Sequence, residues 1–314
     1  MGTRTIRLAF RGPVHFGRGR LSDGVPTCDA ATLFSALFIE AVREGCQGDL
    51  IEAARAGELS LSDAFPYVGD VLYLPKPMLP AGAFDERNRA RERAGEKVDS
   101  RERKANKKLA FVPADGYADY LAGSFDAISA LEDFKLGTGY LETKVNLTRS
   151  TSEDSEPYHV GGYRFRDGAG IYLVARGSYD PTPLLEQLSY AGLGGKRSSG
   201  YGRFEFSVSD ADPTTSVASG GHGLGISVLL STAAPTEVEL TDALLDGARY
   251  QLVRRGGFVQ STTHADTPQK KRDLYLFAAG STFARPFEGG VFDVNATPGA
   301  HPVWRYARAM WMEV

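Results

Sequence analysis

The N-terminal block of the chain holds the pattern that most constrains the fold, an alternating strand followed by an amphipathic helix. Residues Thr5–Phe10 alternate polar and apolar side chains, as a half-buried strand does. After a loop, apolar residues recur at helical spacing over Leu33–Val42, with Thr27 or Asp29 available as a cap and Gly45 as a natural stop. A one-sided helix must bury its apolar face, so this block predicts a helix lying on a sheet.

The rest of the chain continues in the same style, and its periodicity predicts an α+β protein with two domains. We expect strands over Leu59–Phe65, Val71–Leu74, Gly170–Ala175, Tyr201–Val208 and Ile226–Leu230, and helices over Pro181–Ser189 and Asp242–Gly247. The order strand, helix, strands, helix, strand is the ferredoxin-like (RRM-like) plan. A linker rich in Gly, Ser, Thr and Asp over Asp210–Gly223 separates two such domains, at residues 1–209 and 223–314.

Charge and cysteine usage exclude several classes of protein. The chain has 36 basic and 39 acidic side chains and a net charge of −3, whereas a protein that coats nucleic acid is usually strongly basic. Any nucleic-acid surface must therefore be local, or the protein must work inside a larger assembly. Cys28 and Cys46 lack zinc-ligand spacing, so we expect reduced thiols in a cytoplasm and no metal or other cofactor. No apolar run in the sequence approaches the roughly 20 residues of a membrane span.

The most informative segment is a glycine-rich loop over Gly192–Gly202. Five glycines in eleven residues let the backbone approach a ligand closely. Lys196 and Arg197 supply charge at the centre of the loop, and Ser198 and Ser199 supply hydroxyl groups. Backbone N–H groups in such a loop can form a nest for an anion, so the loop predicts phosphate binding.

Two well-known phosphate motifs do not fit this loop. A Walker A loop needs glycine where Tyr190 stands and Ser or Thr where Arg197 stands, and the dinucleotide fingerprint needs glycine at that second position. Both motifs also lie between a strand and a following helix, whereas this loop follows a helix and precedes a strand. The alternative is a tight connection with two solvated cations. We favour a binding role because a merely structural turn rarely needs five glycines.

The loop resembles the glycine-rich signature of the RAMP superfamily, the repeat-associated RNA-binding proteins of CRISPR systems. Pro13–Gly17 and Thr32–Ala36 resemble its first strand-to-helix region, and Asn146–Arg149 its central polar segment. Within the superfamily, the second domain resembles that of one family, subunit four of the Csm complex, on the segments Arg254–Gly257, Lys270–Arg272 and His301–Arg305. The resemblance covers both domains but neither the linker nor a highly charged insert at residues 84–108.

This resemblance implies a non-catalytic subunit of a type III-A (Csm) CRISPR interference complex. Such a subunit binds and caps the 5′ repeat-derived tag of the guide RNA (crRNA), and it joins the large signature subunit to the backbone subunits. Phosphate contacts and stacked, splayed bases usually hold single-stranded RNA. Carried over to this chain, the expected RNA-binding residues are Gly194, Gly195, Lys196, Arg197, Ser198, Ser199 and Gly200 of the loop, Asn146, Thr148 and Arg149, and the cations Arg254, Arg255, Lys270, Lys271 and Arg272.

Two polar inserts interrupt the first domain. Phe84–Lys108 has ten basic and six acidic residues, a net charge of +4, and almost no apolar stripe, so we expect it to be solvated rather than packed. Gly139–Tyr163 is polar and is expected to be loop-rich. The resemblance implies that Phe84–Lys108 or Lys144–Tyr163 forms a thumb that kinks the guide at the edge of the guide–target duplex, and the sequence leaves both open.

Three other functions remain open from the sequence. Some RAMP proteins cleave the repeat, which needs a general base near the 2′-OH, usually histidine. His15 is the best placed of the five histidines, but its neighbours favour a packed side chain. The equivalent subunit of a Cmr complex is a second alternative, disfavoured by the ending His301–Arg305. A free nucleotide-binding protein is the third, disfavoured by the failed Walker A pattern.

Overall fold

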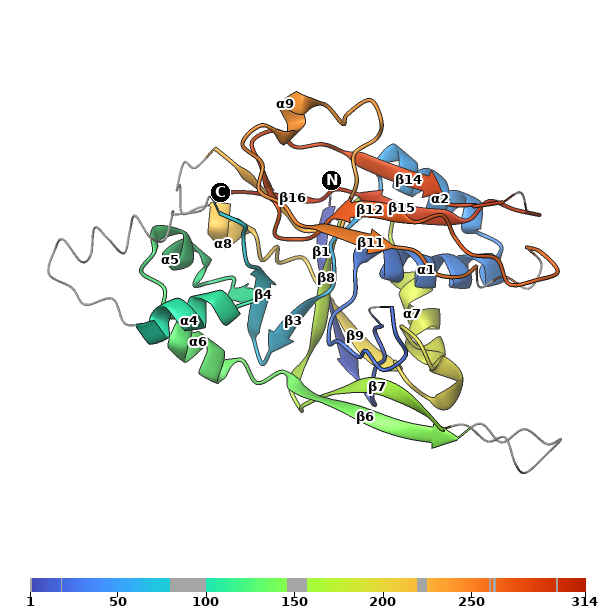
Figure 1. Ribbon diagram of the computed structural model, residues 1–314, viewed down its shortest axis with the longest axis horizontal. Coiled ribbons are helices and arrows are strands. Elements are labelled where there is room, and N and C mark those ends of the chain that lie inside the picture. The colour runs from blue at the N-terminus through green and yellow to red at the C-terminus, as the bar shows by residue number, and fades with distance from the viewer. Residues whose placement is uncertain are drawn as a thin grey trace, which may run out of the picture.

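The computed structural model describes most of the chain (Figure 1). The described residues are 2–17, 19–79, 100–145, 157–218, 225–259, 261, 264–297 and 299–314. Three of the expected RNA-binding residues, Asn146, Thr148 and Arg149, lie outside them. So do most of the charged insert and the end of the predicted linker.

An antiparallel sheet forms the centre of the N-terminal region. Its strands β3, β8, β1 and β9 lie in that order, and β4 and β5 extend it beyond β3. A further short strand, β2, also pairs with β8. The strands are β1 (Gly2–Phe10), β2 (Ser60–Leu61), β3 (Phe65–Val68), β4 (Val71–Pro75), β5 (Phe111–Pro113), β8 (Ala169–Gly177) and β9 (Phe204–Ser209). In the sequence the four central strands follow the order β1, β3, β8, β9. The pairing of β1 with β8 and with β9 therefore joins segments that are distant in the sequence.

Helices α1 (Ala30–Glu44), α2 (Gln47–Ala56) and α7 (Thr182–Ala191) belong to this region. Helix α1 begins as expected, because the Asp29 side chain accepts a hydrogen bond from the Thr32 N–H at 2.8 Å. It ends at Gly45, whose φ of 75° is left-handed and costs glycine little. The predicted strand-to-helix block is therefore confirmed from its first strand to its last cap.

The sheet buries both faces, because successive side chains of β8 point to opposite sides. Ile171 and Leu173 pack in the core that α1, α2 and α7 share. Tyr172 and Val174 pack in a second core on the opposite face. That second core includes Tyr117 and apolar residues of the C-terminal strands, so the C-terminal region closes this face.

The segment between β3 and β8 contains most of the structure that the sequence did not predict. It carries α4 (Ser100–Lys108), α5 (Tyr117–Ala122) and α6 (Ala127–Asp133), followed by β6 (Gly137–Val145) and β7 (Pro157–Phe165). The last part of the charged insert is helical, although Ala105 is its only buried residue among those described. The expected polar loop is instead a β-hairpin, β6–β7, which reaches away from the sheet (Figure 1, green).

The C-terminal region consists of small antiparallel sheets. Strand β10 pairs with β13 and β16, β11 pairs with β12, and β14 pairs with β15. These elements are α8 (Thr215–Ala218), β10 (Ser227–Leu229), α9 (Asp242–Leu245), β11 (Leu252–Arg255), β12 (Leu274–Phe277), β13 (Thr282–Phe283), β14 (Gly289–Asp293), β15 (Trp304–Arg308) and β16 (Trp311–Glu313). The expected α+β class is confirmed, and the expected second helix is reduced to the four residues of α9.

Buried contacts join the two regions. Tyr306 of β15 stacks on Phe34 of α1 with ring centroids 5.0 Å apart, and its hydroxyl accepts a hydrogen bond from the Leu61 N–H at 2.8 Å. The carboxylate of Asp63 accepts hydrogen bonds from the N–H and the hydroxyl of Thr232 at 2.7 and 2.6 Å. Because all of these groups are buried, the regions pack as one body. Every helix within the described ranges is too short or too polar to span a membrane.

Candidate nucleic-acid interface

The glycine-rich loop connects α7 to β9 and packs on the segment Pro13–Phe16. The Gly195 N–H donates to the His15 carbonyl at 2.9 Å, and the Gly202 N–H donates to the Pro13 carbonyl at 2.8 Å. A Cβ added at Gly194 would lie 2.7 Å from the His15 carbonyl oxygen, closer than real Cβ atoms come. Part of the glycine content is therefore structural, because it lets the loop lie directly on this segment.

At the centre of the loop, Ser198, Ser199 and Gly200 are exposed, and the charged Lys196 and Arg197 are partly exposed. Lys196 has a φ of 58°, a left-handed value rare for a residue with a side chain, and the 3-10 turn Arg197–Ser199 follows it. The N–H groups of Lys196, Arg197 and Ser198 donate to no other atom in the part of the chain that the structure describes. The described loop thus keeps unused donors beside two cations, as an anion-binding loop requires.

The β6–β7 hairpin packs against the loop through tyrosines. The Tyr201 hydroxyl donates to Glu142 at 2.8 Å and accepts from the Tyr140 hydroxyl at 3.0 Å. The Lys196 ammonium lies 5.2 Å from the centre of the Tyr158 ring, and that of Lys144 lies 5.4 Å from the Tyr201 ring. The hydrogen bond from Tyr201 lowers the pKa of Glu142, so this carboxyl stays ionised. One of the two candidate thumbs is therefore in contact with the loop.

His15 lies between the loop and the hairpin. Its side chain is buried, and its Nδ1 donates to the Gly161 carbonyl at 2.6 Å. A carbonyl can only accept, so this bond fixes the ring and assigns its Nδ1 proton. These contacts favour the packed role that the sequence suggested for His15.

An open pocket of about 550 Å³ adjoins the loop at the C-terminal ends of α1 and α7. We call it the tyrosine pocket; its lining is Arg43, Tyr190, Ala191, Lys196, Arg197, Ser198 and Arg203. Sequence reasoning found the three loop residues but missed Arg43, Tyr190 and Arg203. Tyr190 and Arg203 flank the loop in the sequence, whereas Arg43 comes from α1 and joins them only through the tertiary fold.

The pocket contains more positive than negative charge. Glu40, whose side chain is 4% exposed, accepts hydrogen bonds from Arg43 at 2.9 and 2.7 Å and lies 3.9 Å from Arg197. Arg203 and Lys196 make no ion pair with any described residue. Four cations therefore line the pocket, and two of them, Arg43 and Arg197, share the carboxylate of Glu40. We call these four residues, Arg43, Lys196, Arg197 and Arg203, the loop cations.

The C-terminal cations, which are Arg254, Arg255, Lys270, Lys271 and Arg272, lie near the other end of α1. Arg255 Nε donates to the carboxylate of Asp29, the helix cap, at 2.6 Å. From Asp29 to Glu40 the helix rises about 16 Å, at about 1.5 Å per residue. The structure therefore does not bring the two predicted groups of cations into one contact site.

Several C-terminal cations already have partners within the protein. Arg254 lies 3.7 Å from Asp273, and Arg272 donates to the Asp293 carbonyl at 2.9 Å. Burial, together with the neighbouring Arg305, lowers the pKa of Lys271 to about 8. Arg254, Lys270 and Arg272 are exposed, whereas Arg255 and Lys271 are partly buried.

Two buried carboxyl groups lie beside Arg255. Asp29 and Asp63 are each 8% exposed, and Asp63 also accepts a hydrogen bond from the first N–H of α1 at 2.8 Å. Burial and the Asp29 charge raise the pKa of Asp63 to about 7, although Thr232 hydrogen bonds oppose this. Burial also acts to raise the pKa of Asp29, but Arg255 and Thr32 outweigh it and lower that pKa. Of the C-terminal cations, Arg255 thus belongs to a buried ionic network.

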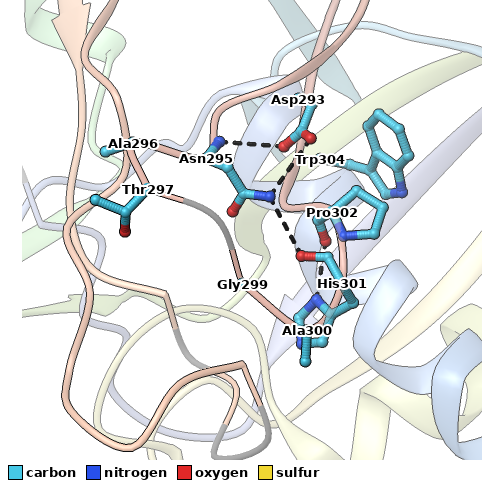
Figure 2. Close-up of a pocket in the computed structure, with 9 residues that line it drawn as sticks. All are labelled: Asp293, Asn295, Ala296, Thr297, Gly299, Ala300, His301, Pro302 and Trp304. Carbon is cyan, nitrogen blue, oxygen red and sulfur yellow. Dashed lines mark hydrogen bonds between the residues drawn. The ribbon is translucent and has the colours of Figure 1, made fainter.

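A second open pocket lies at the far end of the β14–β15 hairpin (Figure 2). Asn295 donates to the His301 carbonyl at 3.2 Å, and the His301 ring accepts or donates at Ser261 Oγ, 2.7 Å away. Figure 2 shows Trp304 and His301 on opposite sides of Pro302. Of the predicted motif His301–Arg305, the first four residues therefore shape this turn; none of the expected RNA-binding residues lines the pocket.

Comparisons with known proteins identify the family. Residues 225–314 match the family model of the CRISPR Csm4 C-terminal domain. A Mycobacterium tuberculosis (strain H37Rv) protein described as "CRISPR system Cms protein Csm4" is 38% identical over 319 residues, covering 99% of this chain and 98% of its own length. A Streptococcus thermophilus protein of the same description is 32% identical over 301 residues, covering 96% and 95%.

Solved structures share the fold. The Csm4 match in "Crystal structure of Csm3-Csm4 subcomplex in the type III-A CRISPR-Cas interference complex" has a TM-score of 0.65 at 15% identity and covers 99% of both chains. "Crystal structure of Csm1-Csm4 cassette in complex with cA4" gives a TM-score of 0.62 at 20% identity, covering 100% of this chain and 98% of that chain.

These matches make the chain a CRISPR-associated protein. By its 38% identity over nearly the whole length, it belongs to the Csm4 family. The resemblance to subunit four of the Csm complex is therefore confirmed, and it is preferred over the equivalent Cmr subunit.

Proposed function

We propose that this protein is the non-catalytic subunit of a type III-A Csm complex that binds and caps the 5′ tag of crRNA. The observation that carries the proposal is the glycine-rich loop, where unused N–H groups and a surplus of cations lie at the surface. Phosphates of single-stranded RNA need such donors and charges. Gly194, Gly195 and Gly200 would let the strand approach, while Lys196, Arg197, Ser198 and Ser199 would contact it.

The β6–β7 hairpin is our candidate for the thumb. It stands beside the loop, and the predicted residues Asn146, Thr148 and Arg149 fall between its two strands in the sequence, outside the described residues. Its contacts with Tyr201 and Lys196 support a continuous surface from the loop to the hairpin. In this proposal the exposed cations Arg254, Lys270 and Arg272 extend the path of the RNA, whereas Arg255 and Lys271 mainly hold the fold.

The domain organisation is part of the proposal. The order β3-β8-β1-β9, with α1 and α7 as connections, supports a ferredoxin-like first domain over residues 1–209. The order β13-β10-β16 supports a second domain of the same plan over residues 223–314, with its first helix shortened to α9. The family match over residues 225–314 supports the boundary.

The partners and the compartment follow from the family. Csm4 relatives are described in complexes with Csm1 and with Csm3, which supports binding of this chain to a large signature subunit and to backbone subunits. We further propose that it acts in the cytoplasm and cleaves no RNA. The packing of His15 against Gly161 supports the last point, because it takes the best-placed histidine away from a substrate.

The test is retention of guide RNA by the Lys196→Ala/Arg197→Ala variant. The tagged protein is purified from its native host, and the RNA that accompanies it is sequenced and quantified. We expect the wild-type protein to carry RNAs that share one 5′ tag ahead of varied spacers. The variant should retain an amount of this RNA that is lower by about tenfold. The matched control is Lys135→Ala/Arg285→Ala, which removes two surface charges elsewhere. If wild type carries no such RNA, the proposal is wrong.

A further inference from the structure

The tyrosine pocket has an aromatic ring where an RNA strand would leave the glycine-rich loop. Tyr190, near the C-terminal end of α7, is 72% exposed, the second highest value among the large hydrophobic residues of the described chain. It shares the pocket with all four loop cations. A single exposed ring is common on protein surfaces, so what points to a ligand is that this ring lines one pocket together with a cluster of cations.

The cations of the pocket are held in place and keep spare charge. Glu40 is nearly buried and binds Arg43 through both carboxylate oxygens, while Arg197 lies 3.9 Å away. This carboxylate orients two guanidinium groups but neutralises only one charge. Arg203 enters from the start of β9 without an ion pair to any described residue, so it is free for an anion.

A flat exposed ring together with fixed guanidinium groups matches one chemistry well. Single-stranded nucleic acid is bound by aromatic rings that stack on bases and by cations that contact the backbone. The ring and the guanidinium groups here line one pocket, so a single nucleotide can contact both. Tyr and Arg are also frequent in protein interfaces, so loss of a protein partner is one outcome of the test below.

We propose that the tyrosine pocket binds one unstacked nucleotide of the tag RNA, with its base on the ring of Tyr190 and its phosphate beside Arg43 and Arg203. This rests on the proposed function, and it adds a base-binding site to the phosphate-binding loop. The nucleotide turns out of the strand beyond the loop and lies over the C-terminal ends of α1 and α7.

The test combines RNA with single missing bases and variants of the ring. Purified protein is titrated with fluorescently labelled tag RNA and with a series in which each tag nucleotide in turn is abasic. For wild type, one abasic position should weaken binding about tenfold, the size expected for one stacked base. Tyr190→Ala should bind intact RNA about tenfold more weakly and show no further loss at that position. Tyr190→Phe should behave as wild type.

The phosphate contact is tested with Arg203→Ala, because Arg203 has no ion pair among the described residues and its loss unpairs no known carboxylate. The slope of log affinity against log salt should decrease by about 0.7. Tyr275→Ala and Arg285→Ala are matched controls at exposed positions in the C-terminal region, and both should bind as wild type.

The outcomes separate this inference from the proposed function. If wild type does not bind tag RNA, both are wrong. If Lys196→Ala/Arg197→Ala weakens binding but Tyr190→Ala binds like Tyr275→Ala, only the tyrosine pocket is wrong. A Tyr190→Ala variant that binds RNA normally but loses a protein subunit would also overturn it, in favour of a protein interface.

Discussion

The loop cations and the C-terminal cations lie at opposite ends of α1 and use their charge differently. At the loop, four cations line one pocket, and only Arg43 and Arg197 share a carboxylate there, that of Glu40. At the other end, Arg255 binds the buried Asp29, Arg254 lies beside Asp273, and burial lowers the pKa of Lys271. The difference teaches that a basic residue can hold a phosphate only when nearby carboxylates do not already neutralise its charge.

At a fixed pH, the largest expected effect on stability is at Arg255. Arg255→Ala leaves the Asp29 carboxylate buried without its cation, which should lower the free energy of unfolding by about 3 kcal/mol. Arg197→Ala should lower it by less than about 1 kcal/mol, because Glu40 keeps Arg43. Urea denaturation followed by circular dichroism measures both. Equal effects of the two substitutions would remove the distinction between the two groups of cations.

The second expected effect is a pH dependence of stability that arises at Asp63, the buried carboxyl group near Asp29 and Arg255. The pKa of Asp63 is about 7 in the folded protein, above its value of about 3.9 in an unfolded chain. The folded state then binds the extra proton, so the free energy of unfolding should fall as pH rises from about 4 to about 7, by at most about 1.4 kcal/mol per pH unit. Urea midpoints measured across this range give the slope.

Asp63→Asn is the control for this pH dependence. It keeps the size of the side chain and an oxygen for the N–H groups of Ala30 and Thr232, but it cannot ionise. Relative to wild type, its stability should therefore gain between pH 4 and pH 7. A wild type and a variant with parallel pH profiles would show that Asp63 titrates normally.

A third, smaller effect compares one lysine from each group. Lys196→Ala should lower the salt slope of RNA binding by about 0.7, because one direct phosphate contact is lost. Lys270→Ala should change it by less, since a cation that only extends the path releases fewer counterions. Fluorescence anisotropy at several salt concentrations measures both slopes. A larger change for Lys270→Ala would move the binding site to the C-terminal region.

The smallest effect is expected at Arg254. Its pair with Asp273 joins two well-exposed side chains, and such pairs contribute little. Arg254→Ala should therefore change the free energy of unfolding by no more than about 0.5 kcal/mol, measured in the same urea series as Arg255→Ala. A loss as large as that of its neighbour would mean that exposure is not what separates these two arginines.

The sequence predicted best the elements that bury one face. Helix α1 and strand β1 place their apolar side chains in one core, so their periodicity is visible locally. The β6–β7 hairpin was missed because most of its β6 side chains are exposed, which leaves no alternation of apolar and polar residues.

The candidate site was predictable only where it is local. The loop cations Lys196 and Arg197 lie within one glycine-rich segment, and Tyr190 and Arg203 flank it without a motif of their own, whereas Arg43 is far away in the sequence. The pairing of Arg255 with Asp29 joins residues 226 positions apart. Neither composition nor spacing can show that such a cation is already neutralised.

The buried contacts between the two regions have a consequence for assembly. Among the described residues, the contacts of Asp63 with Thr232 and of Phe34 with Tyr306 hold the sheet that carries the loop against the C-terminal strands. These contacts favour one fixed orientation of the two regions relative to each other. A partner bound to the N-terminal region is therefore held in one orientation relative to a partner bound to the C-terminal region. Any rearrangement of the assembly must then come from the partners.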